Sequence, residues 1–206
     1  MLAIVDYDMG NLRSVQKAFE LVKCPARVVT QPEEVLRADR LVLPGVGAFA
    51  DAMATLNKTG LAQAVRDFIR TGRPFLGICL GLQLLMDVGY EDGRHAGLGI
   101  IEGDCVRLTV DQPPGNLKVP HMGWNSLAWT PGLPLFKDVP PDSYVYFVHS
   151  YHVQPVQRRL IAATAEYGGP VVAAICRDNV MATQFHPEKS QSAGCTILRN
   201  FSELSC

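Results

Sequence analysis

Apolar runs and amphipathic segments alternate through the first eighty residues of the chain. Four short apolar runs are typical of buried strands, and segments between them repeat apolar residues at helical spacing. The predicted strands cover residues 2–7, 27–29, 40–44 and 75–78. One helix is predicted from about residue 11, and two more cover residues 48–56 and 61–69. This order predicts a mostly parallel sheet with helices on both faces, in which ligands gather outside the carboxyl ends of the strands.

The pattern changes after Gly89, where strand-like segments follow one another with turn residues between them. These segments are 97–108, 143–153, 160–167 and 171–186, with a hairpin turn predicted at 177–179, an irregular Pro/Gly-rich stretch at 111–125 and a last helix at about 193–204. No linker separates two domains. We therefore expect one domain, residues 1–206, with an α/β fold whose mostly parallel sheet has an antiparallel extension in the C-terminal half.

The chain has almost equal numbers of basic and acidic residues, which limits the kinds of binding partner that its charge would favour. The 206 residues include 19 basic and 20 acidic side chains, which gives a formal net charge of -1 at pH 7. Such a balance provides no general attraction to nucleic acid or to an anionic membrane. The apolar part of the first ten residues is too short for a signal peptide, and no later run reaches the length of a membrane span. We therefore expect a cytoplasmic protein with no nucleic-acid and no membrane partner.

The cysteines are scattered and none belongs to a CxxC pair, which favours reduced thiols over disulfides in a chain of this size. They are Cys24, Cys79, Cys105, Cys176, Cys195 and Cys206. His149 and His152 have no cysteine pair near them, so a structural zinc site is not expected.

One of these cysteines stands between two glycines in the run RPFLGICLGLQLLMDV, residues 73–88. A packed strand gains nothing from Gly77 and Gly81, because glycine provides no side chain to bury. A strand, a Gly-x-Cys-x-Gly turn and a following helix would instead lift Cys79 above the sheet, as in a nucleophile elbow. A helix N-terminus there favours thiolate over thiol. The alternative is a buried cysteine in a packing turn.

A thiolate nucleophile needs a base and a group that orients the base, and QFHPEKS at 184–190 can supply both. His186 follows a predicted strand. Glu188 lies two residues further on, where an extended chain would send both side chains to the same side. Glu188 can then fix the imidazole tautomer. On its own, HPE is equally compatible with a strand-end histidine and a solvated charge.

A third strand end, LPGVGAF at 43–49, is rich in glycine. The backbone N–H groups of Val46 or Gly47 can supply one donor to an oxyanion, and that of Leu80 a second. The alternative is a tight turn between strand and helix.

Together these segments resemble a known family, the class I glutamine amidotransferases that use a catalytic triad. GICLGLQ resembles the nucleophile motif, HPE resembles the base and its partner, and the resemblance covers the whole chain. Segments 7–15, 44–49, 118–125 and 146–153 resemble one subgroup, the glutaminase subunits of imidazole glycerol phosphate synthase in histidine biosynthesis. The related glutaminases of anthranilate, carbamoyl phosphate and guanylate synthesis generally differ in the oxyanion loop, which corresponds to residues 44–49 of this chain. Asp8 departs from the pattern, since a small residue is more usual there.

The resemblance implies a reaction and a partner. Cys79 would attack the carboxamide carbon of glutamine, and His186, paired with Glu188, would protonate departing ammonia and then activate water. The resemblance also implies substrate contacts, from Gly45, Val46, Gly47, Leu80, Gln83, Ser150 and Tyr151. Ammonia would pass to a cyclase subunit, a (β/α)8 barrel, in a heterodimer. No metal or organic cofactor is implied.

Three other functions remain open at the level of sequence. The chain could be the glutaminase of another synthase, which would differ in its partner-facing loops. It could be a stand-alone cysteine hydrolase of γ-glutamyl substrates, which would turn over at full rate alone. It could also be a non-catalytic subunit, although the retention of Cys79, His186 and Glu188 argues against that.

Overall fold

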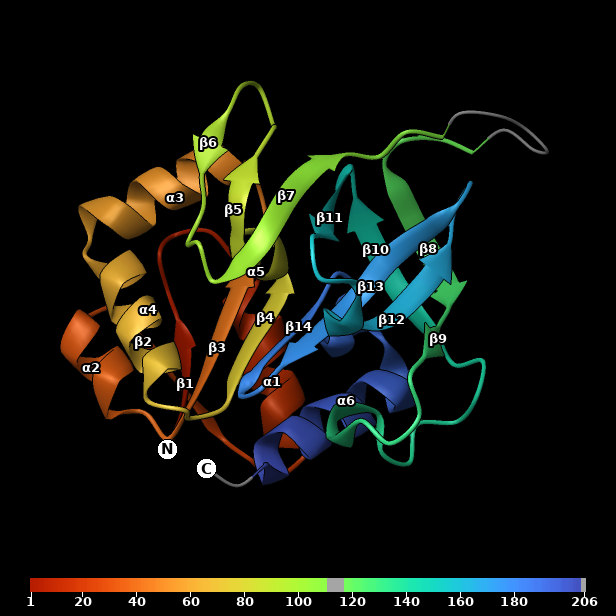
Figure 1. The fold of residues 1–206 in the computed structure, drawn as a ribbon. Coiled ribbons are helices and arrows are strands. Elements are labelled where there is room, and N and C mark those ends of the chain that lie inside the picture. Colours follow the sequence, from red (N-terminus) through yellow and green to blue (C-terminus); the bar gives the residue numbers. More distant parts are fainter. Residues whose placement is uncertain (111–116, 205–206) are drawn as a thin grey trace.

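An eight-stranded sheet runs through the computed structural model, which describes residues 1–110 and 117–204 (Figure 1). Its order is β2-β1-β3-β4-β14-β13-β12-β9. The first five strands are parallel, and β13, β12 and β9 continue the sheet in antiparallel fashion. The strands are β1 (Leu2–Val5), β2 (Ala26–Val29), β3 (Arg40–Gly45), β4 (Phe75–Cys79), β9 (Ala128–Trp129), β12 (Ile161–Glu166), β13 (Pro170–Arg177) and β14 (Val180–Thr183). The predicted fold class, a mostly parallel sheet with an antiparallel extension, is confirmed.

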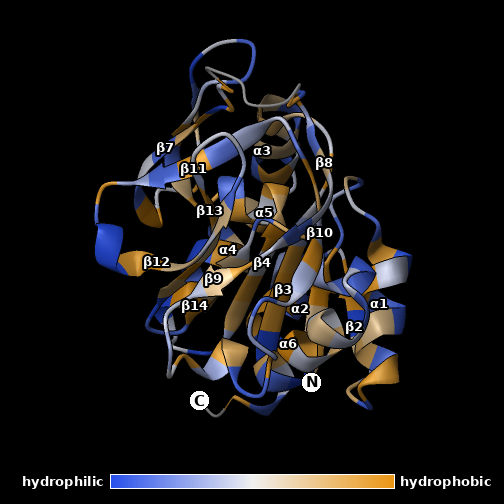
Figure 2. Cartoon of the chain, turned by 90° about the vertical axis from the view of Figure 1, so that its right-hand side faces the viewer, coloured by the Kyte–Doolittle hydropathy of each residue, from blue (hydrophilic) through white to orange (hydrophobic). Residues whose placement is uncertain are grey.

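Helices cover both faces of this sheet because its parallel strands are apolar on both sides (Figure 2). In β1, Ala3 packs among residues of α2, α3 and α4, whereas Ile4 packs on the opposite face with α1 and α6. The helices are α1 (Leu12–Leu21), α2 (Pro32–Arg37), α3 (Phe49–Lys58), α4 (Leu61–Arg70), α5 (Leu80–Gln83) and α6 (Gln191–Glu203), with 3-10 turns at Pro134–Phe136, Arg158–Leu160 and Pro187–Lys189. Helices α1, α3, α4 and α6 agree with the sequence prediction.

Helix α2 was not predicted, for a physical reason. It has one buried residue, Val35, so it carries no repeating apolar stripe. Its signals are those of a charged surface helix: a proline at its start, Glu33 and Glu34 in the first turn and Arg37 in the last.

Smaller sheets sit beside the carboxyl ends of the parallel strands (Figure 1). One has the order β11-β7-β5-β6 and the other pairs β10 with β8. Their strands are β5 (Met86–Gly89), β6 (His95–Ala96), β7 (Ile101–Arg107), β8 (His121–Ser126), β10 (Tyr144–His149) and β11 (Tyr151–Pro155). The predicted run 143–153 is thus two strands, which part at Ser150 to join different sheets.

Two further predicted segments have different outcomes. The stretch 111–125 was expected to be irregular, but His121–Ser126 forms β8, because it pairs residue by residue with β10; residues 111–116 lie outside the described chain. The hairpin predicted at 177–179 is confirmed, since β13 and β14 are antiparallel and Asp178 has φ 52°, as such tight turns require. Within the described residues no helix is long and apolar enough to cross a membrane.

Candidate active site

Cys79 ends strand β4 in a sharp turn with φ 55°, a conformation that a non-glycine residue seldom adopts. The flanking glycines are needed for close approach. A Cβ on Gly81 would lie 1.9 Å from the carbonyl oxygen of Leu43, and one on Gly77 would lie 2.8 Å from the carbonyl oxygen of Gly81. The interpretation of this run as a tight elbow is therefore supported by its packing.

The segment after Cys79 corrects one expectation. The helix was predicted to continue through 88, but α5 ends at Gln83 and Met86–Gly89 is strand β5. Gly89 lies against the ring of Phe49, where a Cβ would come within 2.6 Å. A helix of one turn has little macrodipole, so the argument for thiolate from the helix N-terminus loses most of its force.

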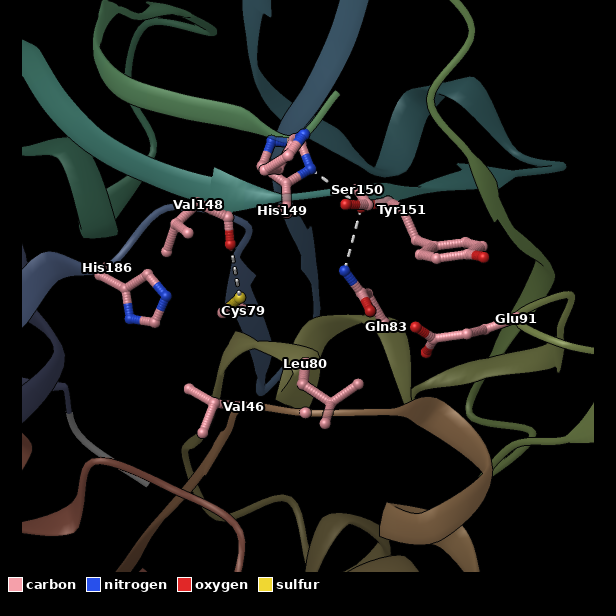
Figure 3. A pocket seen from close by; sticks show the side chains of 12 residues that line it. Val46, Cys79, Leu80, Gln83, Glu91, Val148, His149, Ser150, Tyr151 and His186 are labelled. Carbon is pink, nitrogen blue, oxygen red and sulfur yellow. Dashed lines mark hydrogen bonds between the residues drawn. The ribbon is translucent and has the colours of Figure 1, made fainter. Parts of the chain in front are cut away.

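Cys79 opens into a pocket of about 320 Å³ at the carboxyl ends of the parallel strands (Figure 3). In the view of Figure 3, His186 lies on one side of the thiol, and Gln83, Tyr151 and Glu91 lie on the other. The lining residues are Val46, Gly47, Cys79, Leu80, Gln83, Glu91, Pro120, Val148, His149, Ser150, Tyr151 and His186. The lining comes from six segments of the chain, and three of these carry the predicted substrate-binding residues that lie in the pocket.

Gly45 is the exception among the predicted substrate-binding residues, because it does not line the pocket. A Cβ there would lie 2.3 Å from the Tyr7 hydroxyl and 2.9 Å from the Leu80 Cβ, so its place in the fold is a packing one. Gly47, by contrast, has φ 100° beside the pocket, and Val46 is 42% exposed at its edge.

His186 and Glu188 form a buried pair. Nδ1 of His186 lies 2.7 Å from Oε1 of Glu188, and both side chains are almost fully buried. Burial lowers the pKa of His186, but the interactions with the nearby Cys79 and Glu188 outweigh it and raise the pKa to about 9. Nε2 of His186 has no hydrogen-bond partner within the usual distance and angle limits among the described residues. Contacts between a nucleophile and its base are often long when no substrate is bound.

The prediction that Glu188 would orient His186 agrees with this pair, but the geometry behind it was wrong. Residues Pro187–Lys189 form a 3-10 turn and are not extended. The turn, rather than strand alternation, brings the carboxylate back to the imidazole.

Gln83, one of the expected substrate contacts, is a buried amide and not a polar residue on the surface of the helix. Its side chain is 6% exposed, and Nε2 donates to the carbonyl oxygen of Tyr151 at 3.0 Å and to Oε1 of Gln184 at 3.2 Å. Both amide hydrogens of Gln83 are thereby used, so its oxygen is what it can offer to a bound ligand.

Sequence reasoning missed several residues at the site, among them Glu91, Val148 and Gln184. Glu91 supplies a carboxylate to the pocket and accepts a hydrogen bond from the N–H of Phe49 at 2.7 Å. Val148 O lies 4.0 Å from Sγ of Cys79, and Nε2 of Gln184 lies 3.6 Å from the same sulfur. Gln184 had a usable signal, since an amide at the end of the apolar strand VMATQF must find a buried partner.

Comparisons with known proteins show the family of the chain. The family model "Glutamine amidotransferase class-I" matches residues 3–204, and the chain belongs to this family. It is 54% identical over 206 residues to "Imidazole glycerol phosphate synthase subunit HisH" of Syntrophotalea carbinolica, covering 99% of this chain and 100% of that one. It is 51% identical over 205 residues to the protein of the same description from Geobacter sulfurreducens, covering 98% of each.

A solved structure described as "Crystal structure of glutamine amidotransferase" has a similar fold. The TM-score is 0.74 over 97% of this chain and 96% of that chain, at 17% sequence identity. At this identity the likeness concerns the fold alone.

Proposed function

We propose that the chain is the glutaminase subunit of an imidazole glycerol phosphate synthase, hydrolysing glutamine to glutamate and ammonia through a thioester on Cys79. The observation that carries the proposal is that the strained Cys79 and His186 line one pocket, and that His186 is paired with the buried Glu188. The relatives at 54% and 51% identity carry the description of this subunit, which favours it over other glutaminases.

The reaction follows from the side chains. The sulfur of Cys79 bonds to the carboxamide carbon, and the resulting oxyanion is held by N–H groups of Leu80 and of Val46 or Gly47. His186 gives a proton to the leaving nitrogen, so ammonia departs and a thioester remains. His186 then takes a proton from water, hydroxide adds to the thioester, and the C–S bond breaks to release glutamate and the thiol. Glu188 holds the imidazole in place throughout.

The amino-acid end of glutamine fits the opposite side of the pocket. Glu91 is the carboxylate among the lining residues, and the oxygen of Gln83 is a further acceptor. An α-ammonium group is the natural partner of two acceptors, one of them charged. Ser150 and Tyr151 line the same region (Figure 3).

We infer that ammonia passes to a cyclase subunit with a (β/α)8 barrel, in a cytoplasmic heterodimer. Large apolar side chains are exposed on β8, Met122 at 62% and Trp124 at 46%, as expected of interface anchors. Val46, at the pocket edge, is also exposed, so a docked partner can touch the oxyanion loop directly. Gly47 beside it lets that peptide reorient at low cost.

The test is steady-state glutamate production by the chain alone, and by the chain with the cyclase and its nucleotide substrate. An oxyanion donor contributes about a hundredfold or more to rate, so a partner that completes the site should raise turnover by at least that factor. Full turnover by the isolated chain, unchanged by the cyclase, would support a stand-alone hydrolase. Activation by another synthase and not by the cyclase would support a different amidotransferase.

A further inference from the structure

A buried amide connects the nucleophile to the substrate side of the pocket. Gln184 follows strand β14, and its side chain is completely buried. Nε2 lies 3.6 Å from Sγ of Cys79, and Oε1 lies 3.2 Å from Nε2 of Gln83. One side chain therefore contacts both the reacting sulfur and a residue that lines the ligand's binding region.

The orientation of this amide follows from a main-chain carbonyl. The Tyr151 oxygen can only accept, so the atom of Gln83 that lies 3.0 Å from it must be the NH₂ group. That NH₂ group also faces Gln184, which must therefore present its oxygen to Gln83 and its NH₂ group to the sulfur of Cys79. The donor directed at the sulfur is thus fixed by the network, and not by a choice between two equivalent rotamers.

The same carbonyl is held from its other side. Nδ1 of His149 lies 2.9 Å from the Tyr151 oxygen and must donate to it. Burial lowers the pKa of His149 to about 3, so the ring is neutral and its Nε2 accepts from Nδ1 of His121 at 3.1 Å. The Tyr151 carbonyl therefore has two donors, His149 and Gln83, and little freedom to turn.

We propose that Gln184 is a positioning residue for the glutaminase reaction, which stabilises the thiolate of Cys79 with its NH₂ group and fixes the amide of Gln83 with its oxygen. This inference rests on the proposed function, and it adds a residue outside the Cys-His-Glu set. A hydrogen bond to a charged acceptor is stronger than one to a neutral acceptor, so the contact favours thiolate over thiol.

The second contact of the sulfur, with the carbonyl oxygen of Val148, favours the thiol over the thiolate. Val148 O, 4.0 Å from Sγ, can accept only from the protonated thiol and repels the thiolate. When Cys79 loses its proton to His186, the contact with Val148 is lost and the contact with Gln184 strengthens. Of these two uncharged groups, Gln184 is therefore the one whose contact with the sulfur becomes stronger when Cys79 is a thiolate.

Two variants separate the two roles of Gln184. Gln184→Glu keeps an acceptor for Gln83 but replaces the donor at Cys79 with a carboxylate oxygen. Gln184→Met has a similar length and removes both contacts, without burying a charge. Gln154→Glu, the same chemical change at an exposed position of β11, is the matched control.

The first measurement is the rate at which iodoacetamide alkylates Cys79 at neutral pH, in the chain without glutamine or cyclase. We expect both Gln184 variants to react about tenfold more slowly than the unchanged chain, and Gln154→Glu to react at the unchanged rate. This readout does not depend on glutaminase activity, so it tests Gln184 even if the proposed function fails.

The second measurement is glutamate production with the cyclase and its nucleotide substrate present. Gln184→Glu should lower kcat about tenfold with KM within about twofold of the unchanged chain, because Gln83 keeps its acceptor. Gln184→Met should lower kcat and also raise KM. Loss of this kcat and KM difference between the variants would overturn the role assigned to the Gln184 oxygen.

Other outcomes would also contradict the proposal. Alkylation within twofold of the unchanged rate in both variants would show that the amide does not stabilise the thiolate. Failure of both variants to fold, with a normal Gln154→Glu, would show that Gln184 is a core residue and not a positioning one. Inactivity of the unchanged chain with the cyclase, combined with slow alkylation of the variants, would refute the proposed function and leave the contact with Cys79 intact.

Discussion

Replacing Gly81 with alanine is a sharp test of how the elbow is built. Gly81 lies in α5, where its φ is not in the left-handed region, so helix propensity alone predicts that alanine stabilises the fold by up to about 1 kcal/mol. The structure predicts the opposite, because the new Cβ would lie 1.9 Å from the Leu43 carbonyl oxygen. Helix propensity and packing thus predict changes in stability of opposite sign for Gly81→Ala, so the measured change distinguishes between them.

The size of the effect follows from the clash. Real Cβ contacts essentially never fall under 3.0 Å, so α5 and β3 must separate by about 1 Å. The atom that has to give way is backbone oxygen within the central sheet, and overpacking of this kind costs about 1–3 kcal/mol of unfolding free energy. Cys79 would move with α5, and a displacement of about 1 Å lowers catalytic rate about a hundredfold.

Gly72→Ala is the matched control. Gly72 has φ 80° after α4, and a Cβ there would have no neighbour within 4 Å. Alanine would pay only the left-handed backbone cost, about 1–2 kcal/mol, and should keep full glutaminase activity. Urea unfolding and glutamate production with the cyclase measure both quantities. A Gly81→Ala chain that is as stable as the unchanged chain and fully active would refute the packing argument.

Three further changes have defined outcomes. Glu188→Gln should reduce the free energy of unfolding most below pH 6.5, and this loss of stability should fade as the pH rises through about 9. The reason is that the folded chain holds the His186 proton up to that pKa. A loss of stability that is independent of pH would contradict this. Cys79→Ser should abolish glutamate release while leaving thermal unfolding unchanged, and Cys79 should alkylate faster near neutral pH than Cys105, whose pKa is raised by burial; equal labelling would count against it. Trp124→Ala should weaken cyclase binding about thirtyfold in a titration without changing Cys79 alkylation, and unchanged binding would remove Trp124 from the interface.

Much of this architecture could be predicted from local pattern because the parallel strands are short, apolar and separated by amphipathic helices. Cys79 could be found because its glycines have no purpose in a packed strand. The close approach of Leu43 to Gly81 shows what they are for. Asp8, which departs from the subgroup pattern, has φ 64°, a left-handed conformation that Asp tolerates better than most residues.

The remainder depends on contacts between distant segments, which no local pattern contains. Glu91 lines the pocket because of the fold, and nothing near it in the sequence distinguishes it from an ordinary polar residue. The sequence around Gln184 indicates a buried amide, but only the fold shows that its partner is the sulfur of Cys79. Strand β8 forms because the separate segment Tyr144–His149, strand β10, supplies its partner. The helix-like run after Cys79 continues as a helix only to Gln83, because Met86–Gly89 pairs with β7 and β6 as strand β5. These tertiary contacts override the local pattern.

The most direct test of the account is covalent capture of the nucleophile by a glutamine analogue that carries an electrophilic carbon in place of its carboxamide. The chain, its cyclase and the nucleotide substrate are incubated with the analogue, and labelled peptides are identified by mass spectrometry. We expect one label per chain, on Cys79, whose formation is slowed by excess glutamine and abolished in His186→Ala. Labelling of another cysteine, or labelling of Cys79 that glutamine does not slow, would contradict it.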